Sequence, residues 1–157
     1  MLSNFEIEDI CKKRNIKLNY CNFKDKLPNR KYKSFNGIIN LDSSSPYDGN
    51  PSGSHWTALI IKNRHAFYYD SFGIIYPQEV LNFCKFQNVK HLAYSTKEIQ
   101  NIDDQHCGYF CIGLLQYVKL HTKHDKDLYD IVQNYLEIFN EDTKQNTSIL
   151  EEYLKNP

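Results

Sequence analysis

Hydrophobic residues are spaced differently in the middle and in the last third of this chain. Two short runs, 56–61 and 66–69, are rich in β-branched and aromatic residues and are separated by four polar or charged ones. Such runs favour β-strands, and a connection of this length is typical of a hairpin. The run 107–120 is instead apolar on nearly all sides. That pattern predicts a helix buried in the middle of the folded chain.

A first helix and two further strands are predicted on either side of the hairpin. Ser3 and Glu6 have the spacing of a capping box, so we expect a helix to begin there and to end at about Arg14. A polar stretch follows this helix. The short apolar runs 35–41 and 89–94 each predict a strand.

Three more helical signals lie between and after these strands. Pro77 is suited to the first position of a short helix, because its missing N–H costs nothing there. Apolar residues in 128–139 follow the amphipathic template. Ser148 and Glu151 again have capping-box spacing, which predicts a short last helix that begins after Ser148.

The composition is that of an ordinary globular chain. Its 157 residues are 41% hydrophobic and 24% charged, enough to bury a core without metal or disulfides. No repeat interrupts the pattern, so we expect one domain over 1–157. No apolar run approaches the length of a membrane span, and the N-terminus has no signal-like leader. The protein is therefore expected to stay in the compartment where it is made, without a membrane partner.

The number of cysteines and the net charge indicate the redox compartment and the kinds of partner. Five cysteines are an odd number, which argues against a disulfide framework and for free thiols in a reducing compartment. Lys plus Arg and Asp plus Glu number 19 each, so no overall field attracts nucleic acid. The most basic segment, 24–33, is interpreted as a solvated Lys-rich loop.

Four polar residues have the complementary roles of a thiol protease site. The loop 42–54 is rich in Ser, Pro, Gly, Asn and Asp and leads into His55, and Asp70 follows the second hairpin strand. Gln100 stands in a polar stretch ahead of Cys107, which begins the buried helix. Each residue alone has a plain structural interpretation. Together they supply a base, an orienting carboxylate, an oxyanion donor and a nucleophile, in that order.

The hairpin gives the base and the carboxylate a reason to meet. If the connecting loop has two or four residues, opposed positions sum to 127, so that Thr57 faces Asp70. Side chains alternate along a strand, so His55 and Asp70 then share one face as diagonal neighbours, roughly 7 to 8 Å apart at the backbone. A loop with an odd number of residues would shift this register.

These positions also define what each group would do. The positive end of the buried helix and a protonated His55 both favour the Cys107 thiolate. Asp70 would accept a hydrogen bond from the other ring nitrogen of His55. The Gln100 side chain and the backbone N–H of Cys107 are the expected oxyanion donors.

The remaining thiols and histidines are candidates for a metal site. Cys107 and Cys111 lie one helical turn apart, near His106, His121 and His124, but this set lacks the paired short spacings of structural zinc sites. We therefore expect no metal and no cofactor, and we interpret Cys111 as a core residue. Trp56 fits equally well as a core aromatic or as a wall of a substrate channel.

At these residues the sequence resembles the adenovirus-type and SUMO-protease-type cysteine peptidases, and most closely the maturation proteases of adenoviruses, virophages and related large DNA viruses or transposons. The stretches Gly53-Ser54-His55-Trp56, Asp70-Ser71-Phe72-Gly73 and 100–111 carry the resemblance. Gln100 stands seven positions before Cys107, as in the viral enzymes, whereas SUMO proteases usually have six.

The resemblance implies an α+β fold with a central mixed sheet flanked by helices and the nucleophile on a buried central helix. It implies cleavage after glycine, at Gly-Gly or Gly-X-Gly sites of capsid or core precursors, with Gly53, Ser54 and Trp56 beside the substrate. An enzyme of this kind would work in the host cytoplasm or virus factory and be packaged in the virion. A peptide activator fits the resemblance, but the neutral charge does not favour activation by DNA. The oligomeric state is left open.

The sequence is also compatible with three other functions. The same fold serves proteases that remove ubiquitin-like modifiers, and it can also serve as a catalytically silent interaction module. A related branch transfers acetyl groups from the same thiol, but the chain shows no basic pocket for a coenzyme phosphate.

Overall fold

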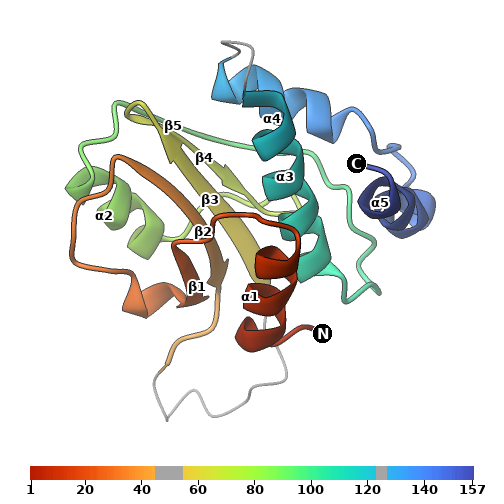
Figure 1. Cartoon of the computed structure of the whole chain (residues 1–157), viewed down its shortest axis with the longest axis horizontal. Helices are drawn as coiled ribbons and strands as arrows, with labels where there is room; N and C mark the ends of the chain where they lie inside the picture. Colours follow the sequence, from red (N-terminus) through yellow and green to blue (C-terminus); the bar gives the residue numbers. More distant parts are fainter. Residues whose placement is uncertain (45–54, 123–126) are drawn as a thin grey trace.

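A five-stranded mixed sheet forms the centre of the molecule in the computed structural model, which describes residues 1–44, 55–122 and 127–157 (Figure 1). The strands are β1 (Tyr20–Phe23), β2 (Ser34–Asn40), β3 (Trp56–Lys62), β4 (His65–Tyr69) and β5 (His91–Tyr94), and they pair in that order. β2, β3 and β4 are antiparallel, whereas β1 and β5 pair in parallel with β2 and β4.

Helices cover both faces of this sheet. They are α1 (Asn4–Lys13), α2 (Gln78–Phe86), α3 (Cys107–His121), α4 (Leu128–Leu136) and α5 (Asn146–Lys155). In Figure 1, α2 lies on one side of the sheet and the other four lie on the opposite side. The expected α+β architecture, with Cys107 at the first position of a buried central helix, is confirmed.

Alternation along the hairpin explains this layering. Ala58 and Ile60 of β3 pack into the core shared with α1, α3, α4 and α5. Leu59 and Ile61 point to the other face and pack with the buried residues of α2. Because both faces are covered, β3 reads as a continuous apolar run.

The hairpin register predicted from the sequence is confirmed. Ala58 pairs with Tyr69 and Lys62 with His65, so opposed positions sum to 127. The loop is the two residues Asn63 and Arg64, whose φ angles are 51° and 66°. Two successive positive φ angles are the mark of a type I′ turn, whose twist matches that of the strands.

The capping box of α1 is confirmed, because the Glu6 N–H donates to the Ser3 hydroxyl and the Ser3 N–H to the Glu6 carboxylate. The predicted start of the last helix is wrong. α5 begins at Asn146, directly after a 3₁₀ turn over Thr143–Gln145. The reason is tertiary: the buried Asn146 amide donates to the carbonyls of Ile99 and Asn140, which no local signal reveals.

Other differences concern element ends and one strand. Pro77 is the N-cap of α2 and not its first helical residue. β1 was not predicted from the sequence, since it is only four residues long and gains its strand pairing from β2. Among the described residues, no helix is long and apolar enough to cross a bilayer.

Candidate active site

His55 and Asp70 meet at the open end of the β3–β4 hairpin. His55 directly precedes β3 and Asp70 directly follows β4. The His55 Nε2 and Asp70 Oδ1 atoms are 2.7 Å apart, and the two side chains are 17% and 1% exposed. The confirmed register thus brings the two predicted residues into direct contact.

A tight turn holds the carboxylate in place. The Phe72 N–H donates to the same Asp70 Oδ1 atom at 2.8 Å, and the Gly73 N–H donates to the Asp70 carbonyl. Gly73 has φ of 74°, and a Cβ there would lie 2.5 Å from the carbonyl oxygen of Thr96. The turn therefore requires glycine at this position.

The environment of His55 favours its protonated form. Burial lowers its pKa, but hydrogen bonds to the Asp70 and Cys107 side chains, together with their negative charges, raise the pKa to about 9. At neutral pH the imidazole is therefore charged. A cation beside the sulfur is the condition under which a cysteine is held as thiolate.

Cys107 begins α3 and is 1% exposed. The Trp56 N–H donates to its Sγ at 3.4 Å, and the first-turn N–H groups of the helix face the same end. A helix N-terminus carries partial positive charge, so Cys107 stands at a position that suits an anion.

Cys111, one turn further along α3, has different surroundings. Its Sγ donates to the Trp56 carbonyl at 3.5 Å, and burial raises its pKa well above the usual value. Cys111 is therefore a neutral core thiol, as expected from the sequence. All five cysteines are free and buried.

Gln100 is buried close to the Asp70 turn. Its amide nitrogen donates to the Asp104 carbonyl at 2.7 Å, and its amide oxygen accepts from the Ser71 hydroxyl at 2.5 Å. The Ile99 and Gln100 N–H groups both donate to the Ser71 carbonyl. The oxyanion donor predicted from the sequence is thus tied to the residue that follows the orienting carboxylate.

The three predicted substrate-binding residues have different outcomes. Trp56 is 4% exposed, and its indole N–H donates to the Leu2 carbonyl at 2.9 Å. The indole is therefore part of the core in this structure, and its contact with substrate stays a prediction. Gly53 and Ser54 lie outside the described residues.

Three neighbours of the site were not assigned a role from the sequence. The Phe72 ring stacks on His55 with centroids 4.8 Å apart. Ser71 binds the Gln100 amide, and Asp104 pairs with the ring of His106, the N-cap residue of α3. The motif Asp70-Ser71-Phe72-Gly73 pointed to this turn, but the contact of Ser71 with Gln100 is tertiary, whereas that of Asp104 with His106 spans two residues.

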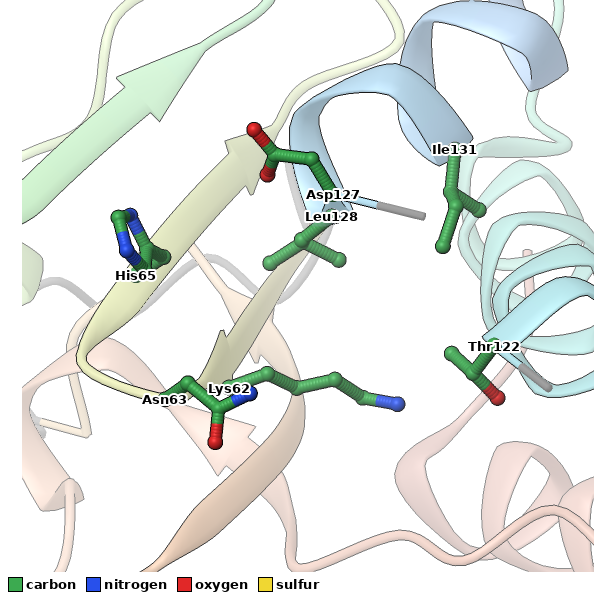
Figure 2. A pocket seen from close by; sticks show the side chains of 7 residues that line it. All are labelled: Lys62, Asn63, His65, Thr122, Asp127, Leu128 and Ile131. Carbon is green, nitrogen blue, oxygen red and sulfur yellow. The ribbon is translucent and has the colours of Figure 1, made fainter. Parts of the chain in front are cut away.

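A cavity at the opposite end of the hairpin is separate from this site. It has a volume of about 510 Å³ and is lined by Lys62, Asn63, His65, Thr122, Asp127, Leu128 and Ile131 (Figure 2). None of the four predicted catalytic residues lines it. Within the described ranges, no three His, Cys, Asp or Glu side chains are grouped so as to hold a metal.

Comparison with known proteins gives a structural match only. No family model and no curated protein matches the sequence. The crystal structure of the ASFV pS273R protease matches with a TM-score of 0.56 and 15% identity, over 89% of this chain and 67% of that chain.

A second structure of the ASFV protease, with selenomethionine, gives a TM-score of 0.51 and 17% identity, over 89% of this chain and 68% of that one. ChlaDub1 from Chlamydia trachomatis gives 0.49 and 15%, over 78% and 60% of the two chains. The α+β fold expected from the sequence is therefore confirmed: this chain has the fold of the ASFV pS273R protease.

Proposed function

We propose that this protein is a cysteine endopeptidase. The observation that carries the proposal is the 2.7 Å contact between His55 and Asp70, in a pair whose imidazole also reaches the side chain of Cys107 at the start of α3. In this arrangement the buried Cys107 thiol is the nucleophile, the charged His55 imidazole is the general acid–base, and the Asp70 carboxylate orients the imidazole.

In the first half of the reaction, the Cys107 thiolate attacks the carbonyl carbon of the scissile peptide. A carbon–sulfur bond forms, and the carbonyl electron pair moves onto the oxygen. The second N–H of the Gln100 amide and the backbone N–H of Cys107 are the donors for this oxyanion. When the intermediate collapses, the carbon–nitrogen bond breaks, and His55 gives its proton to the departing amine.

The second half releases the acyl group. Neutral His55 takes a proton from water, whose oxygen attacks the thioester carbon. The carbon–sulfur bond then breaks, and the sulfur departs as thiolate beside the newly protonated imidazole. Asp70 stays ionised throughout and keeps the Nε2 side of the ring engaged, so that the other nitrogen faces the sulfur.

As the substrate we propose viral capsid or core precursors cleaved after glycine. The support is the resemblance of the His55 and Cys107 motifs to viral maturation proteases and the fold match to a protease of ASFV. We also propose that the enzyme acts in a reducing compartment and is packaged in the virion, since free thiols require the former.

The test is hydrolysis of peptides that contain Gly-Gly or Gly-X-Gly, with Cys107→Ala and Cys111→Ala compared. Cys107→Ala is expected to abolish cleavage, whereas Cys111→Ala, one turn away in the same core, keeps it. Cleavage by Cys107→Ala would overturn the mechanism. A ubiquitin-like modifier with a C-terminal electrophile that labels Cys107, without precursor cleavage, would instead assign the site to deconjugation.

A further inference from the structure

The Gln100 amide is held at both of its ends. The Ser71 hydroxyl contacts its oxygen, and the Asp104 carbonyl contacts its nitrogen at 2.7 Å. The Gln100 and Ser71 residues are 1% and 0% exposed. Among the described residues, the structure provides no second acceptor for the amide nitrogen, so one N–H stays available.

The Asp104 contact decides which way round the amide sits. A backbone carbonyl can only accept, so the atom that faces Asp104 is the nitrogen and the atom that faces Ser71 is the oxygen. The Ser71 hydroxyl therefore donates. In the opposite orientation two oxygens would face each other at Asp104, in a buried setting where an unmade hydrogen bond costs about 1 to 3 kcal/mol.

Ser71 is itself fixed by its neighbours. Its carbonyl accepts from the Ile99 N–H at 2.9 Å and from the Gln100 N–H at 3.1 Å. It also directly follows Asp70, which carries the hydrogen bond to His55. Ser71 thus links the end of β4, where Asp70 orients His55, to the segment that holds Gln100.

We propose that Ser71 is a positioning residue for the Gln100 oxyanion donor, and this inference rests on the proposed function. By donating to the amide oxygen, Ser71 restricts rotation of the Gln100 side chain and keeps its free N–H aimed at the reacting carbonyl. The gain appears only when charge develops on that carbonyl, so the effect belongs to the transition state and not to substrate binding.

Steady-state kinetics of Ser71→Ala, Gln100→Ala and the double variant test this role. We expect Ser71→Ala to lower kcat about tenfold at unchanged KM, because one oxyanion donor supplies on the order of a hundredfold or more. In the Gln100→Ala background the same change is expected to have no further effect. An equal loss in both backgrounds, or no loss in either, would overturn the proposal.

Ser95→Ala is the matched control. Ser95 is also buried, at 3% exposure, and its hydroxyl accepts from the Lys97 N–H within its own turn. Loss of that local bond is expected to leave kcat within twofold of the parent value. A tenfold loss in this variant as well would mean that any buried serine matters, and it would remove the special role of Ser71.

A second readout does not depend on catalysis. In the parent protein, the NMR signals of the Gln100 side-chain amide are expected to be protected from exchange, and in Ser71→Ala this protection is lost while the backbone amides of Ile99 and Gln100 keep theirs. Unchanged side-chain protection would refute the contact. If the parent cleaves no peptide but the protection changes as expected, the proposed function fails and the positioning contact stands.

Discussion

The two ends of the β3–β4 hairpin each have a histidine and an aspartate beside them, but these residues differ in what they contact. At the open end, His55 and Asp70 are 2.7 Å apart, and the Cys107 side chain helps to raise the pKa of the imidazole. At the turn end, His65 and Asp127 line one cavity, but His65 stacks on His91 and Asp127 caps α4 through the Tyr129 N–H. Histidine and aspartate near one another therefore do not make a site unless one binds the other beside a nucleophile.

Burial separates the two ends as well. Asp70 is 1% exposed, and its carboxylate is paired with the protonated His55 ring. Asp127 is exposed, and its carboxylate accepts from the Tyr129 N–H at the start of α4. At the turn end, burial lowers the pKa of Lys62, and its ammonium group extends into the cavity in Figure 2. The turn end serves chain reversal and helix capping, and the open end has the features needed for acid–base chemistry.

The largest difference between the two ends is expected when the negative charge of Asp70 is removed at the open end. Asp70→Asn is expected to lower kcat by about a thousandfold, because the neutral amide stabilises neither the ring orientation nor the imidazolium. The pKa of His55 should fall from about 9, since Asp70 raises it. Peptide hydrolysis and NMR titration of His55 measure the two effects.

His65→Ala at the turn end is the control for that variant, with activity expected within twofold of the parent. Comparable losses from Asp70→Asn and His65→Ala would show that the hairpin acts as one unit, and that the distinction between its two ends is wrong.

The pH dependence of stability gives a second, smaller contrast. The pKa of His55 is raised from 6.5 to about 9 in the folded protein. Protonated His55 therefore adds up to about 3 kcal/mol to the free energy of unfolding. This stabilisation is fully present below pH 6.5 and is lost as pH rises through 9. Urea unfolding at pH 6, 7.5 and 9 measures this, with His55→Ala as the reference. Parallel pH curves for the parent and the variant would contradict the assignment.

The smallest expected effect lies at the turn end. Asp127→Ala removes the side-chain cap of α4 and is expected to cost about 1 kcal/mol of stability, with kcat unchanged. Thermal unfolding and peptide hydrolysis measure both quantities. Asp127→Asn keeps an acceptor and should recover most of the loss. A drop in kcat for Asp127→Ala would link the turn-end cavity to catalysis.

The sequence predicted the parts of this molecule that depend on local periodicity. Side-chain alternation and a short polar loop were enough to place Thr57 opposite Asp70 and hence Asp70 near His55. The continuous apolar run at 107–120 predicted α3, because a helix buried on all sides has no polar face. The capping box at Ser3 is likewise local.

What could not be predicted depends on contacts between distant segments. Ser71 and Gln100 are separated in sequence by 29 positions, and nothing in either neighbourhood indicates that a hydroxyl meets an amide there. Asn146 begins α5 because Ile99 accepts from its amide, so the local signal at Ser148 was misleading. The Trp56 indole bond to Leu2 is equally remote, and Gly53 and Ser54 remain untested.

The backbone of Trp56 contacts two sulfurs, and both contacts depend on the register of β3. One peptide unit on each side of Trp56 meets one sulfur, with the N–H at Cys107 and the carbonyl at Cys111. A shift of β3 by one residue would remove both contacts together and turn His55 to the other face of the sheet. Under the proposed function, a molecule with that strand error would lose both the base and the N–H that contacts the nucleophile, so misassembled copies would be inert and not indiscriminately proteolytic.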